Sequence, residues 1–212
     1  MRATSLLSLP LALLLTACPK DEPEDSAACV PPFAVYTDID ETLTLSDGEW
    51  LAQITDPTYD PALRPDAAAL MRAYAERGYS IFYVTARGED MELSDGRSSR
   101  EATEDWLLAH DFPYVEGALY LSEGYGATGD AAVAYKSGVI DDRTAGGWTA
   151  SWAYGNADTD ILAFQASGIP DDHIFLVGEL AGTMGVEPVP DEEAYTNHLE
   201  AQLPSIAHVA CD

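Results

Sequence analysis

The sequence predicts an α/β fold, a three-layer domain in which a parallel sheet of about five strands has helices on both faces. One observation is that short apolar runs alternate with longer segments whose apolar residues recur at helical spacing. A second is that polar residues follow three of the runs directly, at Asp38, Thr85 and Asn156. The length of 212 residues suits one domain, and the 47% hydrophobic content suits a packed core.

The first expected strand is Phe33 to Tyr36, a short apolar run that leads into carboxylates. A helix is expected from Pro65 to Arg77. It has proline in its first turn, and Gly78 lies just past its end. The second strand is Tyr79 to Val84, a run of β-branched and aromatic residues.

Another helix and strand are expected in the middle of the chain. Ser98 to His110 should be helical, with Trp106 and Leu107 on its apolar face. Ala118 to Leu121 should form the third strand. Tyr135 to Thr144 has only a weak helical pattern, and we expect it to be a helix.

The last elements complete the alternation. Ser151 to Tyr154 is a short strand, and Asp160 to Ser167 is a helix that Gly168 ends. His173 to Val177 is the fifth strand. The chain then becomes acidic and is weakly helical around Glu192 to Leu203. In such parallel sheets, ligands bind beyond the carboxyl ends of the strands.

The charge balance is strongly acidic. Lys and Arg total 10 against 37 Asp and Glu, and the formal net charge is -27. Such a surface repels nucleic acid, so we exclude nucleic-acid binding as a primary role. Because the acids are spread along the whole chain, solubility or salt adaptation explains them better than affinity for cations or cationic partners.

The first 17 residues are expected to be a signal peptide. Leu6 to Leu15 is a mainly apolar run that is too short to span a bilayer. The sequence Leu15 to Cys18 resembles the lipobox of bacterial lipoproteins, which implies a lipid on Cys18. The alternative is ordinary secretion with cleavage near Ser26 to Ala28. We expect an exported, membrane-anchored lipoprotein that faces the periplasm or the cell exterior.

Residues 18–32 are acidic and contain proline, and we expect them to form an extended tether. The domain then spans residues 33–212, including an acidic, weakly helical tail at 185–212. Export would place Cys29 and Cys211 where disulfides persist, so they are a candidate disulfide. The alternative is two reduced thiols.

The segment Asp38-Ile39-Asp40-Glu41-Thr42 carries the main chemical signal. Side chains at positions i and i+2 of a strand share a side, so both aspartates can face one site. One carboxylate can attack phosphorus, and the other can protonate the leaving oxygen and later activate water.

Further polar residues support this interpretation. Thr85 ends the second strand with a hydroxyl that can donate to a phosphoryl oxygen. Lys136 is one of only two lysines, and a lysine in so acidic a domain suggests a placed charge. The segment from Gly155 to Asp160 offers oxygen ligands of the kind that Mg²⁺ prefers. We expect Arg87 and Arg100 to form ion pairs with the surplus acids.

Together, these residues resemble the four motifs of the haloacid dehalogenase-type (HAD) phosphohydrolase superfamily, which has a Rossmann-like fold. The resemblance is strongest over residues 33–182. Within the superfamily, the segments 38–47, 83–87 and 155–175 look most like the lipin-like (LNS2) phosphatidate phosphatase domain. Glu41 departs from the glycine that is usual in lipin-like sequences. The intervals between motifs leave no room for a large cap domain.

The resemblance implies a role for each matching residue. Asp38 would be the nucleophile and Asp40 the general acid and base. Thr42 would brace the loop near the substrate phosphate, which Thr85 and Lys136 would hold. The ligands of Mg²⁺ would be Asp38, the backbone carbonyl of Asp40 and Asn156. Asp160 would either bind Mg²⁺ through a water molecule or act as a partner of Lys136.

Three functions remain open at this point. The first is a phosphatidate-type lipid phosphatase that acts through an aspartyl-phosphate. The second is a broad-specificity acid phosphatase on soluble phosphomonoesters. The third is a non-catalytic domain that senses phospholipids, which the intact Asp38 and Asp40 argue against.

Overall fold

The structure is a computed structural model that describes residues 33–191 and 194–209. It contains a six-stranded sheet with the strand order β3-β2-β1-β4-β5-β6, and every neighbouring pair is parallel. The proposed signal peptide and tether lie outside the described residues, as do Cys18, Cys29 and Cys211. None of the helices in the described part of the chain has the length and apolar character needed to cross a membrane.

The elements follow the expected alternation. The strands are β1 (Phe33–Thr37), β2 (Ser80–Gly88), β3 (Leu119–Ser122), β4 (Thr149–Gly155), β5 (Ile174–Leu176) and β6 (Glu187–Pro188). The α-helices are α1 (Gly48–Thr55), α2 (Ala67–Ala75), α3 (Ser99–Ala109), α4 (Asp130–Ala145), α5 (Asp158–Ala166) and α6 (Thr196–Gln202).

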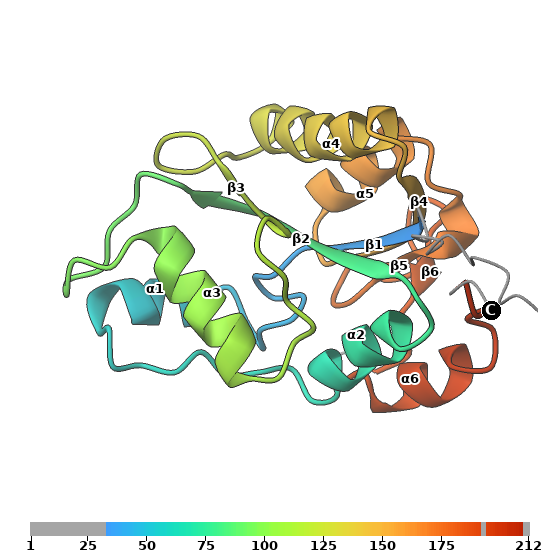
Figure 1. Ribbon diagram of the computed structural model, residues 1–212, viewed down its shortest axis with the longest axis horizontal. Coiled ribbons are helices and arrows are strands. Elements are labelled where there is room, and N and C mark those ends of the chain that lie inside the picture. The colour runs from blue at the N-terminus through green and yellow to red at the C-terminus, as the bar shows by residue number, and fades with distance from the viewer. Residues whose placement is uncertain (1–32, 192–193, 210–212) are drawn as a thin grey trace, which may run out of the picture.

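Helices cover both faces of the sheet, so the molecule has three layers. Helices α4 and α5 lie on one side of the sheet, and α2, α3 and α6 lie on the other (Figure 1). A separate hydrophobic core lies between the sheet and each of the two helical layers. Met71, Trp106 and Tyr195 belong to the core beneath α2, α3 and α6, whereas Ile140 and Phe164 belong to the core beneath α4 and α5. The predicted three-layer α/β fold is therefore confirmed.

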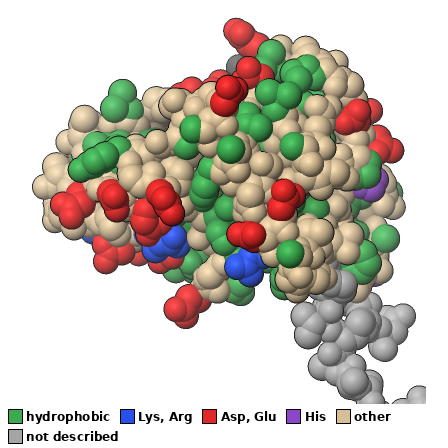
Figure 2. All heavy atoms as spheres, turned by 90° about the horizontal axis from the view of Figure 1, so that it is seen from above, with side chains coloured by type: hydrophobic (Ala, Val, Ile, Leu, Met, Phe, Trp, Pro, Cys, Tyr) green, Lys and Arg blue, Asp and Glu red, His purple; other side chains and the backbone are tan. Residues whose placement is uncertain are grey.

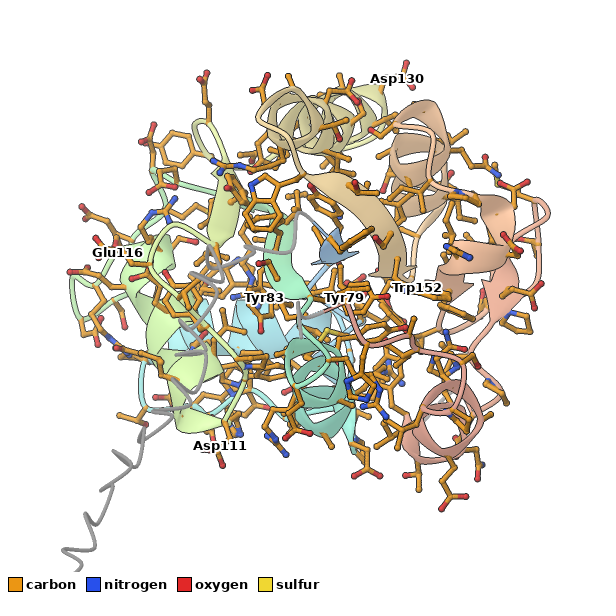
Figure 3. All side chains as sticks on the ribbon, turned by 45° about the vertical axis from the view of Figure 1, so that its right-hand side comes forward. Tyr79, Tyr83, Asp111, Glu116, Asp130 and Trp152 are labelled. Atoms are coloured by element: carbon orange, nitrogen blue, oxygen red, sulfur yellow. The ribbon has the colours of Figure 1, made fainter. Side chains whose placement is uncertain are left out.

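Successive side chains of the strands contribute to the two cores in turn. In β1, Val35 faces one core, while Ala34 and Tyr36 face the other. Figure 3 shows Tyr79 and Tyr83 close to the middle of the sheet, whereas Asp111 lies at the edge of the molecule. Both faces of the central strands are buried, which explains why these strands are almost continuously apolar.

Helix α1 and strand β6 were not expected from the sequence. Helix α1 is only eight residues long, and Asp47 at its start makes no capping hydrogen bond with its side chain. The two-residue β6 has no strand pattern of its own and pairs with β5 through Phe175 and Leu176. Helix α4 begins at Asp130, earlier than expected. This start was not predicted because the residues before Tyr135 carry little helical periodicity.

The described segments that join the strands contain short helices and no separate cap domain, as expected. Helix α1 and the loop between β3 and α4 both lie at the left-hand end of the molecule in Figure 1, beyond the carboxyl ends of the central strands. These two segments therefore flank the edge of the sheet at which an α/β active site belongs.

Candidate active site

Asp38 lies directly after β1 and is almost completely buried. Its backbone N–H donates to the carbonyl of Tyr154, which joins the end of β1 to β4. Its carboxylate accepts one hydrogen bond on each oxygen. Lys136 Nζ donates to Oδ1 over 2.7 Å, and Thr42 Oγ1 donates to Oδ2 over 3.1 Å. The carboxylate is thus fixed in orientation before any substrate arrives.

Lys136 reaches Asp38 from α4 and is itself buried. Its ammonium also donates to Asp160 Oδ1 over 2.5 Å, so one positive charge is shared by two carboxylates. Burial works to lower the pKa of Lys136, but Asp160 and Asp38 raise it above its ordinary value. Burial raises the pKa of Asp38 to about 7, although Lys136 opposes that shift. When both carboxylates are ionised, Asp38 and Asp160 carry two negative charges, and the single ammonium of Lys136 balances only one of them.

Asp160 is fully buried at the start of α5, where backbone N–H groups favour a carboxylate. Its Oδ2 accepts from the N–H groups of Asn156 and Ala157, over 3.0 and 3.1 Å. Gly155 makes room for it, because a Cβ at that position would lie 2.5 Å from the Cβ of Asp160. Both oxygens of Asp160 are therefore occupied, which agrees with the expected role as a partner of Lys136.

Asn156 joins β4 to the loop that follows β1. Its Oδ1 lies 3.2 Å from Thr42 Oγ1, and its Nδ2 donates to Glu41 Oε2 over 3.1 Å. A hydroxyl has only one proton to donate, yet Thr42 Oγ1 lies close to an oxygen of both Asp38 and Asn156. Two hard oxygen donors, one charged and one neutral, therefore converge beside Thr42.

These donors fit Mg²⁺, which prefers carboxylate and carbonyl oxygens. Within the described ranges, no three His, Cys, Asp or Glu side chains gather into a metal-binding cluster. A divalent cation would thus rely on Asp38, on the amide oxygen of Asn156 and on the backbone carbonyl of Asp40. The excess negative charge around Lys136 also favours a cation beside Asp38.

Asp40 is held by a different set of residues. Arg87, at the end of β2, donates from Nη2 to Asp40 Oδ1 over 2.8 Å and from Nε to Oδ2 over 2.9 Å. Thr85 Oγ1 also donates to Oδ2, over 3.3 Å. Arg87 is buried, donates to Thr103 of α3 over 2.8 Å, and lies 4.2 Å from the centre of the Trp50 ring. The second aspartate is therefore held on both oxygens by a fixed guanidinium.

Arg64 braces the loop between the two aspartates and α1. It is buried, and it donates to the backbone carbonyls of Thr42, Glu41 and Leu45 over 3.2, 2.7 and 3.2 Å. Glu41 has a φ of 56°, and its carbonyl is one of these acceptors. The role of Arg64 was not expected from the sequence, in which it is one of eight arginines and belongs to no motif.

The structure brings together the site residues that were expected from the sequence, some at strand ends and others on helices: Asp38, Asp40, Thr42, Thr85, Lys136, Asn156 and Asp160. The expected ion pairs of Arg87 and Arg100 are confirmed, with Asp40 and Glu89 respectively. The choice of Asp40 as the partner of Arg87 was not foreseen.

Elsewhere the surface is acidic. Figure 2 shows many Asp and Glu side chains on one face of the molecule and few Lys or Arg side chains. Hydrophobic side chains are spread over the same face and include some at its left-hand end, where the strands have their carboxyl ends.

Residues 35–178 match a protein family described as the LNS2 domain of PITM 1-3. Membrane-associated phosphatidylinositol transfer protein 3 of Homo sapiens is 27% identical over 157 residues, which are 73% of this chain and 15% of that protein. Protein retinal degeneration B of Drosophila melanogaster is 26% identical over 169 residues, which are 79% of this chain and 12% of that protein. This chain thus spans less than a sixth of the length of these relatives.

Solved structures share the fold. A protein described as a HAD-like phosphatase from Mesorhizobium loti has a TM-score of 0.55 and 18% identity, over 84% of this chain and 88% of that one. The D,D-heptose 1.7-bisphosphate phosphatase from B. bronchiseptica, complexed with magnesium and phosphate, has a TM-score of 0.54 and 13% identity, over 80% and 98%. The fold is that of HAD-like phosphatases.

Proposed function

This chain belongs to the PITM 1-3 LNS2 domain family, and on that premise we propose that it is a Mg²⁺-dependent phosphomonoester hydrolase with Asp38 as its nucleophile. The observation that carries the proposal is the fixed carboxylate of Asp38, which Lys136 and Thr42 orient at the end of β1. Bound Mg²⁺ would offset negative charge on the phosphoryl group and on Asp38.

In the first half of the reaction, an oxygen of Asp38 attacks phosphorus and the bond to the leaving oxygen breaks. Asp40 donates a proton to that oxygen, and the alcohol departs, leaving an aspartyl-phosphate. In the second half, Asp40 takes a proton from water as the water attacks phosphorus. Inorganic phosphate is released, and Asp38 returns to its carboxylate form. Lys136 stabilises the charge of the Asp38 carboxylate before the attack and again after phosphate has left.

We further propose phosphatidate as a substrate, because the relatives are named for phosphatidylinositol transfer and the family is an LNS2 family. The experiment is to measure phosphate release by the full chain in detergent, with Mg²⁺ and with EDTA. The substrates are phosphatidate in mixed micelles and a panel of soluble phosphomonoesters, and Asp38→Asn is the control.

Mg²⁺-dependent release from phosphatidate that is lost in Asp38→Asn supports the lipid phosphatase. Phosphate release from the soluble esters alone supports the proposed hydrolase mechanism and contradicts phosphatidate as the substrate. Release that persists with EDTA or in Asp38→Asn contradicts the proposed mechanism.

One observation favours a second candidate, a phospholipid-binding domain without activity. Both oxygens of Asp40 are occupied by Arg87, and an acid held in this way must be freed before it can transfer a proton. Titration of phosphatidate micelles into the full chain separates the two. Heat of binding without phosphate release supports the binding domain.

We also propose that the protein is exported and anchored to a membrane through a lipid on Cys18, because Leu15 to Cys18 resembles a lipobox. Mass spectrometry of the protein from its membrane fraction tests this. The expected N-terminal residue is a lipid-modified Cys18, and Cys18→Ser should lack the added mass. An unmodified Cys18 in the native protein would contradict the anchor.

A further inference from the structure

A cleft of about 440 Å³ opens beside Asp40, and neither Asp38 nor Lys136 is among the residues that line it. One wall is α1, and the other is the loop between β3 and α4, which Figure 1 places at the same end of the molecule. The residues of this cleft that matter here are Asp40, Trp50, Leu51, Ile54, Arg87 and Tyr125.

The loop side of the cleft is firmly seated on the end of β2. The N–H of Ala127 donates to the carbonyl of Ala86 over 3.0 Å, and the N–H of Asp90 donates to the carbonyl of Gly124 over 2.9 Å. Gly88 permits this approach, because a Cβ there would lie 2.3 Å from the backbone carbon of Tyr125. The wall is thus a built part of the fold.

The side chains at the mouth of the cleft are apolar and exposed. Leu51 on α1 is 64% exposed and Tyr125 on the loop is 82% exposed, higher fractions than most of the other large hydrophobic residues show. Trp50 and Ile54 continue the apolar wall inward. Exposed apolar side chains on both rims of a cleft mark a ligand site, since covering them with an apolar group removes that surface from water.

The charges in the cleft oppose an anionic ligand. Among the residues that the structure describes, Arg87 is the only basic one that lines it, and its guanidinium is already engaged by Asp40 and Thr103. Asp47 adds a negative charge at the rim. A second phosphate or a carboxylate would therefore meet repulsion without a free cation to offset it.

We propose that this cleft receives the leaving alcohol of the substrate, and that the alcohol is apolar and uncharged, with Leu51 and Tyr125 as the residues that select it. This inference rests on the proposed function, because Asp40 must touch the leaving oxygen and the cleft begins at Asp40. Both a lipid phosphate and a soluble alkyl phosphate have such an alcohol, and both share this recognition chemistry.

The test uses hexylphosphonate and ethylphosphonate, which carry the same headgroup and cannot be hydrolysed by this chemistry. Each is titrated into the full chain with Mg²⁺ by calorimetry. The longer chain has four more methylene groups, and it should bind roughly 100-fold more tightly when these are buried in the cleft. The double variant Leu51→Ser, Tyr125→Ser should lose that preference. Leu108→Ser is the matched control, because Leu108 is 58% exposed on α3 and does not line the cleft.

Equal binding of the two phosphonates overturns the proposal, as does a preference that survives in the double variant or is equally lost in Leu108→Ser. Absence of binding by either phosphonate overturns it too. Hydrolysis is measured separately, on hexyl phosphate and on dioctanoyl phosphatidate. If the chain prefers hexylphosphonate but releases phosphate from neither hexyl phosphate nor dioctanoyl phosphatidate, the cleft is supported as a binding site and the proposed hydrolase activity is contradicted. Release from only one of the two identifies the lipid or the soluble ester as the source of the alcohol.

Discussion

Arg87 and Asp40 form a two-point ion pair in which two nitrogens of the guanidinium meet both oxygens of the carboxylate, at 2.8 and 2.9 Å. The pair joins the end of β2 to the loop after β1. It sets where the carboxylate of Asp40 lies before this carboxylate is released for the proposed proton transfer, so Arg87 is a positioning residue for the proposed reaction.

Arg87→Lys tests that positioning. Lysine keeps the charge but cannot bridge both oxygens of Asp40 and also reach Thr103. We expect kcat to fall about tenfold with KM nearly unchanged, and the pH profile of kcat to shift, because proton transfer is the affected step. Thr103→Val is the control, since it removes only the outer contact. A variant with normal kcat and an unchanged pH profile argues against the role.

Lys136→Met tests the buried charge group. The substitution leaves Asp38 and Asp160 without their shared cation, and breaking a buried ion pair in this way costs about 3 kcal/mol of the free energy of unfolding. Adding Asp160→Asn removes one of the stranded charges, so the double variant should be more stable than Lys136→Met alone. Urea denaturation at pH 7 measures both. Equal stability of the single and double variants contradicts the shared-ammonium arrangement.

Gly155→Ala tests the fit between β4 and Asp160. The added methyl group would overlap Asp160, so we expect a loss of about 1–3 kcal/mol in the free energy of unfolding, together with reduced activity. Gly138→Ala is the matched control. Gly138 lies within α4 with nothing near its Cβ position, so alanine there should stabilise the protein by about 0.5–1 kcal/mol. Equal effects of the two changes would falsify this account of Gly155.

His198 links stability to pH. It is buried on α6, where its Nε2 lies 3.0 Å from the hydroxyl of Tyr154, and burial lowers its pKa to about 4. The unfolded chain takes up a proton near pH 6.5, but the folded protein does not until about pH 4. The contribution of His198 is therefore complete above pH 6.5 and is lost as the pH falls toward 4, by up to about 3 kcal/mol.

The measurement compares thermal unfolding of the native chain and of His198→Phe between pH 7.5 and pH 4.5. The melting temperature of the native chain should fall relative to that of His198→Phe as the pH falls, because phenylalanine does not titrate. A difference that is constant across this range rules out the titration of His198 as a cause.

The sequence predicted the central part of this fold because its signals are local. The apolar run before Asp38, the proline and Gly78 around α2, and the run before Thr85 each depend on neighbours in the chain. Helix α1 was missed for the same reason. Its eight residues have no capping side chain, and it is stabilised by contacts such as the stacking of Trp50 on Arg87.

The members of the candidate site could be predicted, but only some of its pairings. Strand ends place Asp38, Thr85 and Asn156 at one edge of a parallel sheet. A partnership of Asp160 with Lys136 was one of the two roles that the family resemblance implied for Asp160. The pairing of Arg87 with Asp40 depends on how separate elements approach one another in the fold, and nothing in the sequence indicates it.

The walls of the cleft consist of α1 and the loop before α4, and neither segment supplies Asp38, Lys136 or Asp160. Reaction and recognition are therefore carried by different stretches of polypeptide. Evolution or a protein engineer could exchange Leu51 and Tyr125, or graft a different loop between β3 and α4, and retarget the domain while its reactive centre stays intact.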